Sequence, residues 1–98
     1  GPLGLSVEPL NSAQRKALEL MQGEGVVINR VDSRQALQAG LKPGDVILMV
    51  GQKRIGDVSA FHSAIAHLKK GDTAMLLVRD GRSDRTGFVT LTVPSRGD

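Results

Sequence analysis

Few side chains in this sequence are placed for catalysis or metal binding. His62 and His67 lie five positions apart in a stretch with helical spacing, so their side chains point about 140° away from each other. They are therefore not expected to share a metal ion, and the absence of cysteine removes thiolate chemistry and cysteine-bound zinc. No serine lies in a Gly-x-Ser-x-Gly segment. We expect these 98 residues to hold no catalytic site, no metal and no cofactor.

The composition also argues against nucleic-acid binding and membrane insertion. The net charge is +3, but the basic residues lie in scattered pairs with acidic residues among them, which is typical of a solvated surface. Phe61 and Phe88 are the only aromatic residues, too few for a surface on which bases stack. No apolar run approaches the roughly 18 residues of a membrane span.

The first third of the sequence contains signals for two strands and one helix. Residues 3–7 alternate apolar and small residues, which predicts a short strand. Asn11 and Gln14 form the pattern of a capping box, and the apolar stripe behind them predicts a helix that reaches Met21 and stops at Gly23. The β-branched residues 25–31 predict a buried strand.

Turn signals dominate the middle of the chain. Ser33 can cap a short helix that Gly40 closes in a left-handed conformation. Pro43 and Gly44 suit the two central positions of a type II turn. The turn leads into residues 45–50, which we expect to form a tight hairpin with residues 52–55 across Gly51.

The last half predicts a helix followed by a hairpin. Asp57 can cap a helix running to about Lys70, with five residues on one apolar face: Val58, Phe61, Ala64, Ile65 and Leu68. Strands 73–79 and 87–93 flank a polar loop. The helices between strands could indicate a parallel βαβ sheet. The hairpins favour an α+β domain instead, a small and largely antiparallel partial barrel closed by helices.

Four segments together resemble a PDZ domain, and the most specific of them is Ala-Gly-Leu-Lys-Pro-Gly-Asp-Val-Ile at residues 39–47. The others are residues 3–5, residues 25–28 and the helix end at 64–69. The bacterial form of HtrA/Deg (DegP/DegQ/MucD-like) serine proteases fits best, because its carboxylate-binding loop lies at the domain's N-terminus. The resemblance implies a partly open antiparallel β-barrel with circularly permuted topology, capped by two to three helices.

The resemblance also implies a binding site. Backbone N–H groups of Leu3, Gly4 and Leu5 would hold a peptide's C-terminal carboxylate. The peptide would add as a strand in a groove formed by six residues: Leu5, Ser6, Val7, Phe61, Ile65 and Leu68. Leu3 would help line its side-chain pocket, and His62 could lie at its rim, where protonation would tune binding. Helical spacing alone favours core for the three helix residues, and only the resemblance assigns them to a groove.

These expectations lead to a peptide-binding module of a periplasmic HtrA-like serine protease. It would bind hydrophobic C-termini or extended segments of unfolded proteins and recruit substrate or regulate the protease, without catalysing a reaction itself. Its other partners would be the protease domain and neighbouring subunits. Two alternatives are a second PDZ domain that acts mainly in oligomer assembly, and a PDZ domain of a site-2-type membrane protease or a secretion component.

The expected domain covers residues 3–93, with a flexible tail at 94–98. Gly1-Pro2 matches the remnant that a tag-cleaving protease leaves. Because Pro2 has no N–H group and adjoins the expected carboxylate loop, its presence there is expected to weaken binding.

Overall fold

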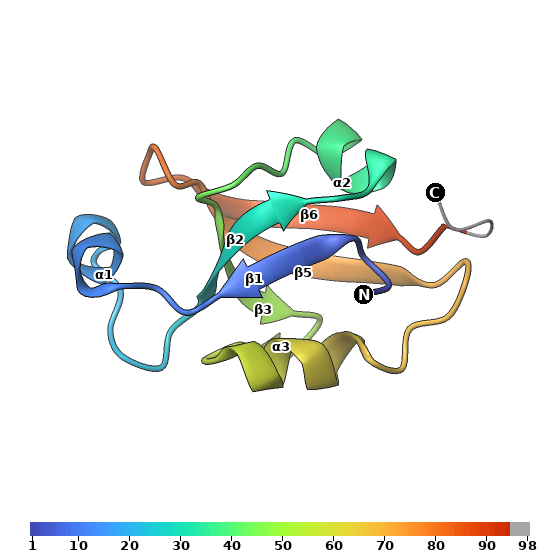
Figure 1. Ribbon diagram of the computed structural model, residues 1–98, viewed down its shortest axis with the longest axis horizontal. Coiled ribbons are helices and arrows are strands. Elements are labelled where there is room, and N and C mark those ends of the chain that lie inside the picture. Colours follow the sequence, from blue (N-terminus) through green and yellow to red (C-terminus); the bar gives the residue numbers. More distant parts are fainter. Residues whose placement is uncertain (95–98) are drawn as a thin grey trace.

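The computed structural model describes residues 1–94 as six strands and three helices (Figure 1). In chain order they are β1 (Leu5–Glu8), α1 (Ser12–Leu18), β2 (Val26–Val31), α2 (Arg34–Gln38), β3 (Val46–Val50), β4 (Lys53–Arg54), α3 (Val58–Ile65), β5 (Thr73–Arg79) and β6 (Thr86–Thr92). The tail predicted at 94–98 lies outside the described residues except for Pro94.

All pairings in the sheet are antiparallel, and the sheet is open. Its strand order is β1-β2-β3-β5-β6, with the short β4 paired to β3. β1 and β6 are the two edge strands, and each pairs with a single neighbour. The register shifts between Ser6 and Val7 in β1 and between Ile47 and Met49 in β3. This confirms the predicted α+β class and excludes the parallel βαβ alternative.

Short-range signals in the sequence are realised by hydrogen bonds between near neighbours. The Asn11 side chain accepts from the Gln14 N–H and the Gln14 side chain accepts from the Asn11 N–H, both at 2.8 Å, which is a complete capping box. Ser33 caps α2. In the predicted turn, Gly44 has a φ of 98° and the Asp45 N–H donates to the Lys42 carbonyl.

Two helices end earlier than predicted. α1 stops at Leu18 because Glu19 adopts a left-handed conformation, with a φ of 57°, and the predicted stripe residue Met21 is 74% exposed. α3 stops at Ile65 instead of reaching Lys70. The Asp72 carboxylate accepts from the Lys69 N–H and the Asp72 N–H donates back to the Lys69 carbonyl, which closes a separate turn after the helix.

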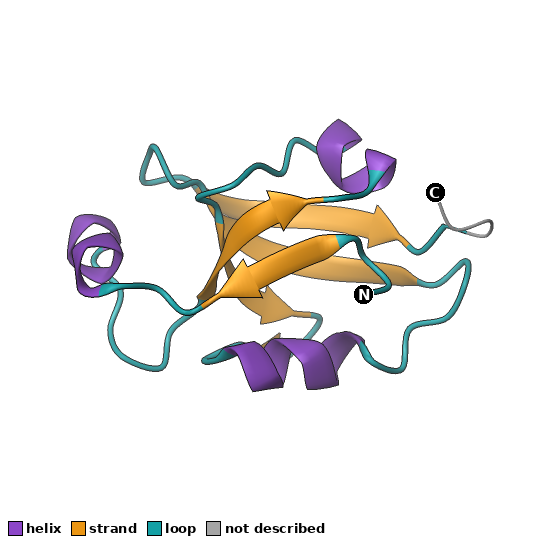
Figure 2. Cartoon of the chain, viewed as in Figure 1, coloured by secondary structure: helices purple, strands orange, loops and turns teal. Residues whose placement is uncertain are grey.

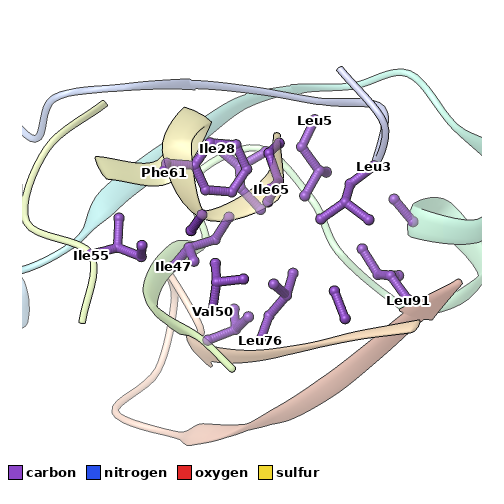
Figure 3. Close-up of a cluster of buried hydrophobic side chains, with 14 of the residues drawn as sticks. Leu3, Leu5, Ile28, Ile47, Val50, Ile55, Phe61, Ile65, Leu76 and Leu91 are labelled. Atoms are coloured by element: carbon purple, nitrogen blue, oxygen red, sulfur yellow. The ribbon is translucent and has the colours of Figure 1, made fainter. Parts of the chain in front are cut away.

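The main hydrophobic core lies between one face of the sheet, α2 and α3, as Figures 2 and 3 show. Phe61 of α3 is its largest fully buried side chain, and Ile28, Ile47 and Leu76 reach the same cluster from three strands. A smaller cluster lies on the opposite face and contains Leu10, Leu20, Val27 and Val46. We call these two faces the inner face and the outer face.

Candidate functional site

Edge strand β1 runs beside α3, and its outer side has no neighbouring strand (Figures 1 and 2). The Asp32 N–H donates to the Gly4 carbonyl at 2.7 Å. Hydrogen bonds in antiparallel pairs alternate along a strand, so the Gly4 carbonyl and the backbone of Ser6 point toward β2 and the residue after it, while Leu5 directs its N–H and C=O to the open edge. After the register shift, Val7 lies opposite Ile28. The N–H and C=O of Ile28 point away from β1, because they bond to Asp45 and Gly44. Val7 therefore has no backbone hydrogen bond to β2, and its N–H and C=O also face the open edge.

The loop before β1 is held tightly against the start of α2. The Ser33 hydroxyl donates to the Leu3 carbonyl at 3.0 Å and accepts from the Ala36 N–H at 3.1 Å. Gly4 has a φ of 67°, and a Cβ atom there would lie 2.4 Å from the Ser33 Cβ. The position therefore requires glycine both for its backbone conformation and for the close approach of Ser33.

The three N–H groups predicted to hold a carboxylate differ in their surroundings. The Leu5 N–H faces the open edge, because the carbonyl of the same peptide group, that of Gly4, accepts from Asp32 on the opposite side. The Gly4 N–H donates to the Gly1 carbonyl at 3.1 Å, which folds residues 1–4 into a turn. The strand itself begins at Leu5, so Leu3 belongs to this turn and not to the predicted strand.

Most side chains predicted to line a groove belong to the main core. Leu3, Leu5, Phe61 and Ile65 are at most 5% exposed, and Figure 3 shows them pointing toward one another between β1 and α3. Val7 and Leu68 are partly buried against the same cluster. An incoming apolar side chain would have to part these residues.

Leu68 lies beyond the end of α3, where it lines a cavity of about 380 Å³ between that helix, the β3–β4 turn and the start of β5. It therefore lies outside the helix in which the sequence predicted it, although it still packs against the main core. The cause is the early end of α3 at Ile65.

Polar side chains lie on the elements that flank β1. His62 is exposed, and its ring lies edge-on to Phe61 with 5.7 Å between centroids. Ser6 lies opposite Arg30 in the β1–β2 register. Arg30 forms an ion pair of 2.8 Å with Asp32, which also accepts a 3.5 Å hydrogen bond from Ser6. Neither Arg30 nor Asp32 was predicted to lie beside the strand.

A network of charged side chains with shifted pKa values lies away from this edge. Lys42 contacts the buried carboxylate of Asp45 at 3.1 Å and Asp80 at 3.3 Å. The hydrogen bond to Asp45 raises the pKa of Lys42 above its usual range. A hydrogen bond from the Arg82 N–H, with a further one from Lys42, lowers the pKa of Asp80. This network fastens the β5–β6 loop to the turn before β3.

Residues 1–94 contain no group of three or more His, Cys, Asp or Glu side chains that could hold a metal ion. No helix among these residues is long and apolar enough to cross a membrane.

The architecture and the sequence both match a known family. Residues 1–91 match the family described as PDZ domain. The chain belongs to the PDZ domain family. The "Probable periplasmic serine endoprotease DegP-like" of Pseudomonas putida (strain F1) is 39% identical over 89 residues, which cover 90% of this chain and 18% of that protein. "Periplasmic serine endoprotease DegP" of Escherichia coli K12 is 32% identical over 84 residues, 84% of this chain and 18% of that protein. This PDZ chain thus spans about a fifth of these relatives.

Solved PDZ structures agree with the fold. The "HtrA-type protease AlgW with tripeptide" superposes with a TM-score of 0.81 at 25% identity, over 93% of this chain and 30% of that chain. The HtrA3 PDZ domain bound to a phage-derived ligand superposes with a TM-score of 0.71 at 18% identity, over 92% of this chain and 81% of that chain. At that identity the second match concerns the fold alone.

Proposed function

We propose that this PDZ domain binds an extended peptide as an added strand along β1, between that strand and α3. The observation that carries the proposal is the direction of the backbone at Leu5 and Val7, whose N–H and C=O groups face the open edge. A peptide strand would satisfy these groups without displacing any hydrogen bond of the sheet. The AlgW structures, solved with a tripeptide and a decapeptide, support peptide binding by likeness.

The N–H groups of Leu3, Gly4 and Leu5 would receive the peptide's terminal carboxylate. The bond between the Gly4 N–H and the Gly1 carbonyl would be exchanged for one to the carboxylate, so this contact competes with the ligand. The site would select apolar residues at the terminus and two positions before it. The reason is that the peptide's side chains would insert between Leu5, Phe61 and Ile65, whose side chains are all apolar.

The domain would serve a longer protein. We propose an HtrA-like periplasmic serine protease as that protein, with this domain recruiting extended segments of unfolded substrates or regulating the protease. The catalytic step would lie in another domain. The DegP-like relatives, which are about five times longer than this chain, support this assignment.

The decisive experiment is an NMR titration of the isotope-labelled domain with a peptide that ends in apolar residues, beside its C-terminally amidated copy. We expect shifts at Leu3–Val7 and at Phe61–Leu68 that are lost on amidation. Absence of shifts at saturating peptide would contradict the proposal and favour the oligomer-assembly alternative.

A variant pair tests the strand addition itself. Val7→Pro removes an N–H that faces the open edge and leaves the hydrogen bonds to β2 in place, so we expect affinity to fall at least about tenfold with the fold retained. Val7→Thr keeps this N–H and is the matched control. Equal affinities for the two variants would show that the peptide does not pair with β1.

A further inference from the structure

The outer face of the sheet is covered only at one end. There α1 and the loop that follows it pack Leu10 and Leu20 against Val27 and Val46, and Figure 1 shows α1 at this end of the molecule. No helix among residues 1–94 covers the continuation of this face over the remainder of β3, β5 and β6, where two large apolar side chains, Met75 and Phe88, are exposed.

Half-buried and exposed side chains form a row across four strands of this face. Arg54 of β4 lies opposite Met49 of β3, Met49 opposite Leu77 of β5, and Leu77 opposite Phe88 of β6. Directly opposed residues share one face of a sheet, so these four side chains are neighbours. We call them the outer row. Phe88 is 67% exposed, and Met75, two positions from Leu77 on the same face of β5, is 50% exposed.

One end of the outer row opens into a cleft. It has a volume of about 250 Å³ and is lined by Leu48, Met49, Ile55 and Leu77, with Arg54 and the loop at residues 23–25 at its rim. Leu48 also packs against the smaller core under α1. The apolar surface is therefore continuous from that core, through the cleft, to Phe88.

The charges at this surface are mainly positive. Within residues 1–94, the Arg54 side chain donates no hydrogen bond and forms no ion pair, so its charge is available to a partner. The other arginine of this face, Arg79, already donates to the Leu18 carbonyl and to Thr86. The one acid at the cleft, Glu24, accepts from the Met21 N–H of its own loop.

We propose that the outer row is a second interaction surface, which docks an acidic and apolar segment of another protein. Apolar side chains of the segment would cover Met49, Leu77 and Phe88, and a carboxylate would pair with Arg54. The charge selects this occupant over a second copy of the chain, because a copy would bring its own Arg54 to the contact. The surface lies on the opposite face of the sheet from α3, so its use does not depend on peptide binding at β1.

The test uses two N-acetylated and C-amidated peptides of equal length, one of leucines and glutamates and one of leucines and lysines. Capped ends keep both peptides from the carboxylate loop. In NMR titrations we expect the acidic peptide to shift resonances of Met49, Arg54, Leu77 and Phe88, and the basic peptide to bind at least about tenfold more weakly.

Phe88→Ser and Arg54→Glu should each weaken the acidic peptide about tenfold, and Arg54→Glu should strengthen the basic one. Leu37→Ser on α2 removes another exposed apolar side chain and should leave binding unchanged. Equal binding of the two peptides, shifts confined to β1 and α3, or no binding at all would overturn the proposal. Self-association of the domain that Phe88→Ser abolishes would also overturn it, in favour of a second copy as occupant.

Discussion

The two phenylalanines of this chain occupy opposite faces of one sheet and opposite environments. Phe61 packs from α3 onto the inner face and is fully buried, whereas Phe88 stands on the outer face and is 67% exposed. The inner face is closed by elements from both ends of the chain, including Leu3 and Leu91. The outer face is closed only where α1 reaches. We therefore expect the free energy of unfolding to depend mainly on the inner face. Residues of the outer face can then be substituted, and can serve binding, with little loss of stability.

The largest expected effect comes from emptying the inner face. Phe61→Ala should lower the free energy of unfolding by about 4 kcal/mol, because it removes a fully buried aromatic side chain and leaves a cavity. The measurement is urea denaturation followed by circular dichroism. A loss below about 1 kcal/mol would mean that the inner core relaxes around the gap. It would contradict the expectation that stability depends more on the inner face than on the outer face.

A smaller loss is expected at the loop that closes the inner face. Gly4→Ala should cost about 2 to 3 kcal/mol, because the new Cβ meets Ser33 in addition to the strain of a positive φ. Gly40→Ala is the control, since Gly40 also has a positive φ but nothing lies within 4 Å of its Cβ position. That variant should lose about 1 kcal/mol. Equal losses would show that Ser33 moves aside without cost.

On the outer face, substitution of phenylalanine by alanine should have little effect on the free energy of unfolding. Phe88→Ala should change the free energy of unfolding by about 0.5 kcal/mol or less, because its side chain is mostly exposed and has one cross-strand neighbour, Leu77. The experiment is the same urea series that tests Phe61. A loss approaching that of Phe61→Ala would mean that the outer row is structural.

The smallest effect should come from the ionised carboxylate of Asp80, whose contacts fasten the β5–β6 loop to the turn before β3, and this effect should disappear in acid. The pKa of Asp80 is lowered from its ordinary value of 3.8, so its stabilising effect is present above that value and is lost as the pH falls through the lower, folded-state pKa. The stability difference between wild type and Asp80→Asn should therefore shrink as the solution is acidified below about pH 4. Thermal denaturation at pH 7 and pH 3 measures it. A difference that stays constant would exclude ionised Asp80 as its source.

Sequence reasoning succeeded where the deciding contacts are local. The capping box at Asn11 and the Pro43-Gly44 turn use partners within three residues, so their residue types suffice to predict them. The end of α1 was not predictable in this way. It depends on Glu19 in a left-handed conformation, which that residue rarely adopts, and on Arg15, which binds the carbonyls of Met21 and Glu24.

The sequence predicted the elements of the candidate site but only part of their packing. The resemblance placed a strand beside a helix, and β1 and α3 are so arranged. Helical spacing favoured core for Phe61 and Ile65, which are buried, but the sequence did not indicate that Leu3 and Leu5 would be as buried as ordinary core residues, because burial depends on how closely α3 approaches the sheet. The outer row was also missed, since it depends on the register of four strands.

The alternation of backbone direction along β1 has a consequence for amide hydrogen exchange. In the free domain the protons of Leu5 and Val7 face solvent and should exchange quickly, while that of Ser6, bonded to β2, should be protected. A strand-adding ligand would protect all three and remove this odd-even pattern. A ligand on the outer row would leave the pattern unchanged, so three neighbouring amides can report which face of the domain is occupied.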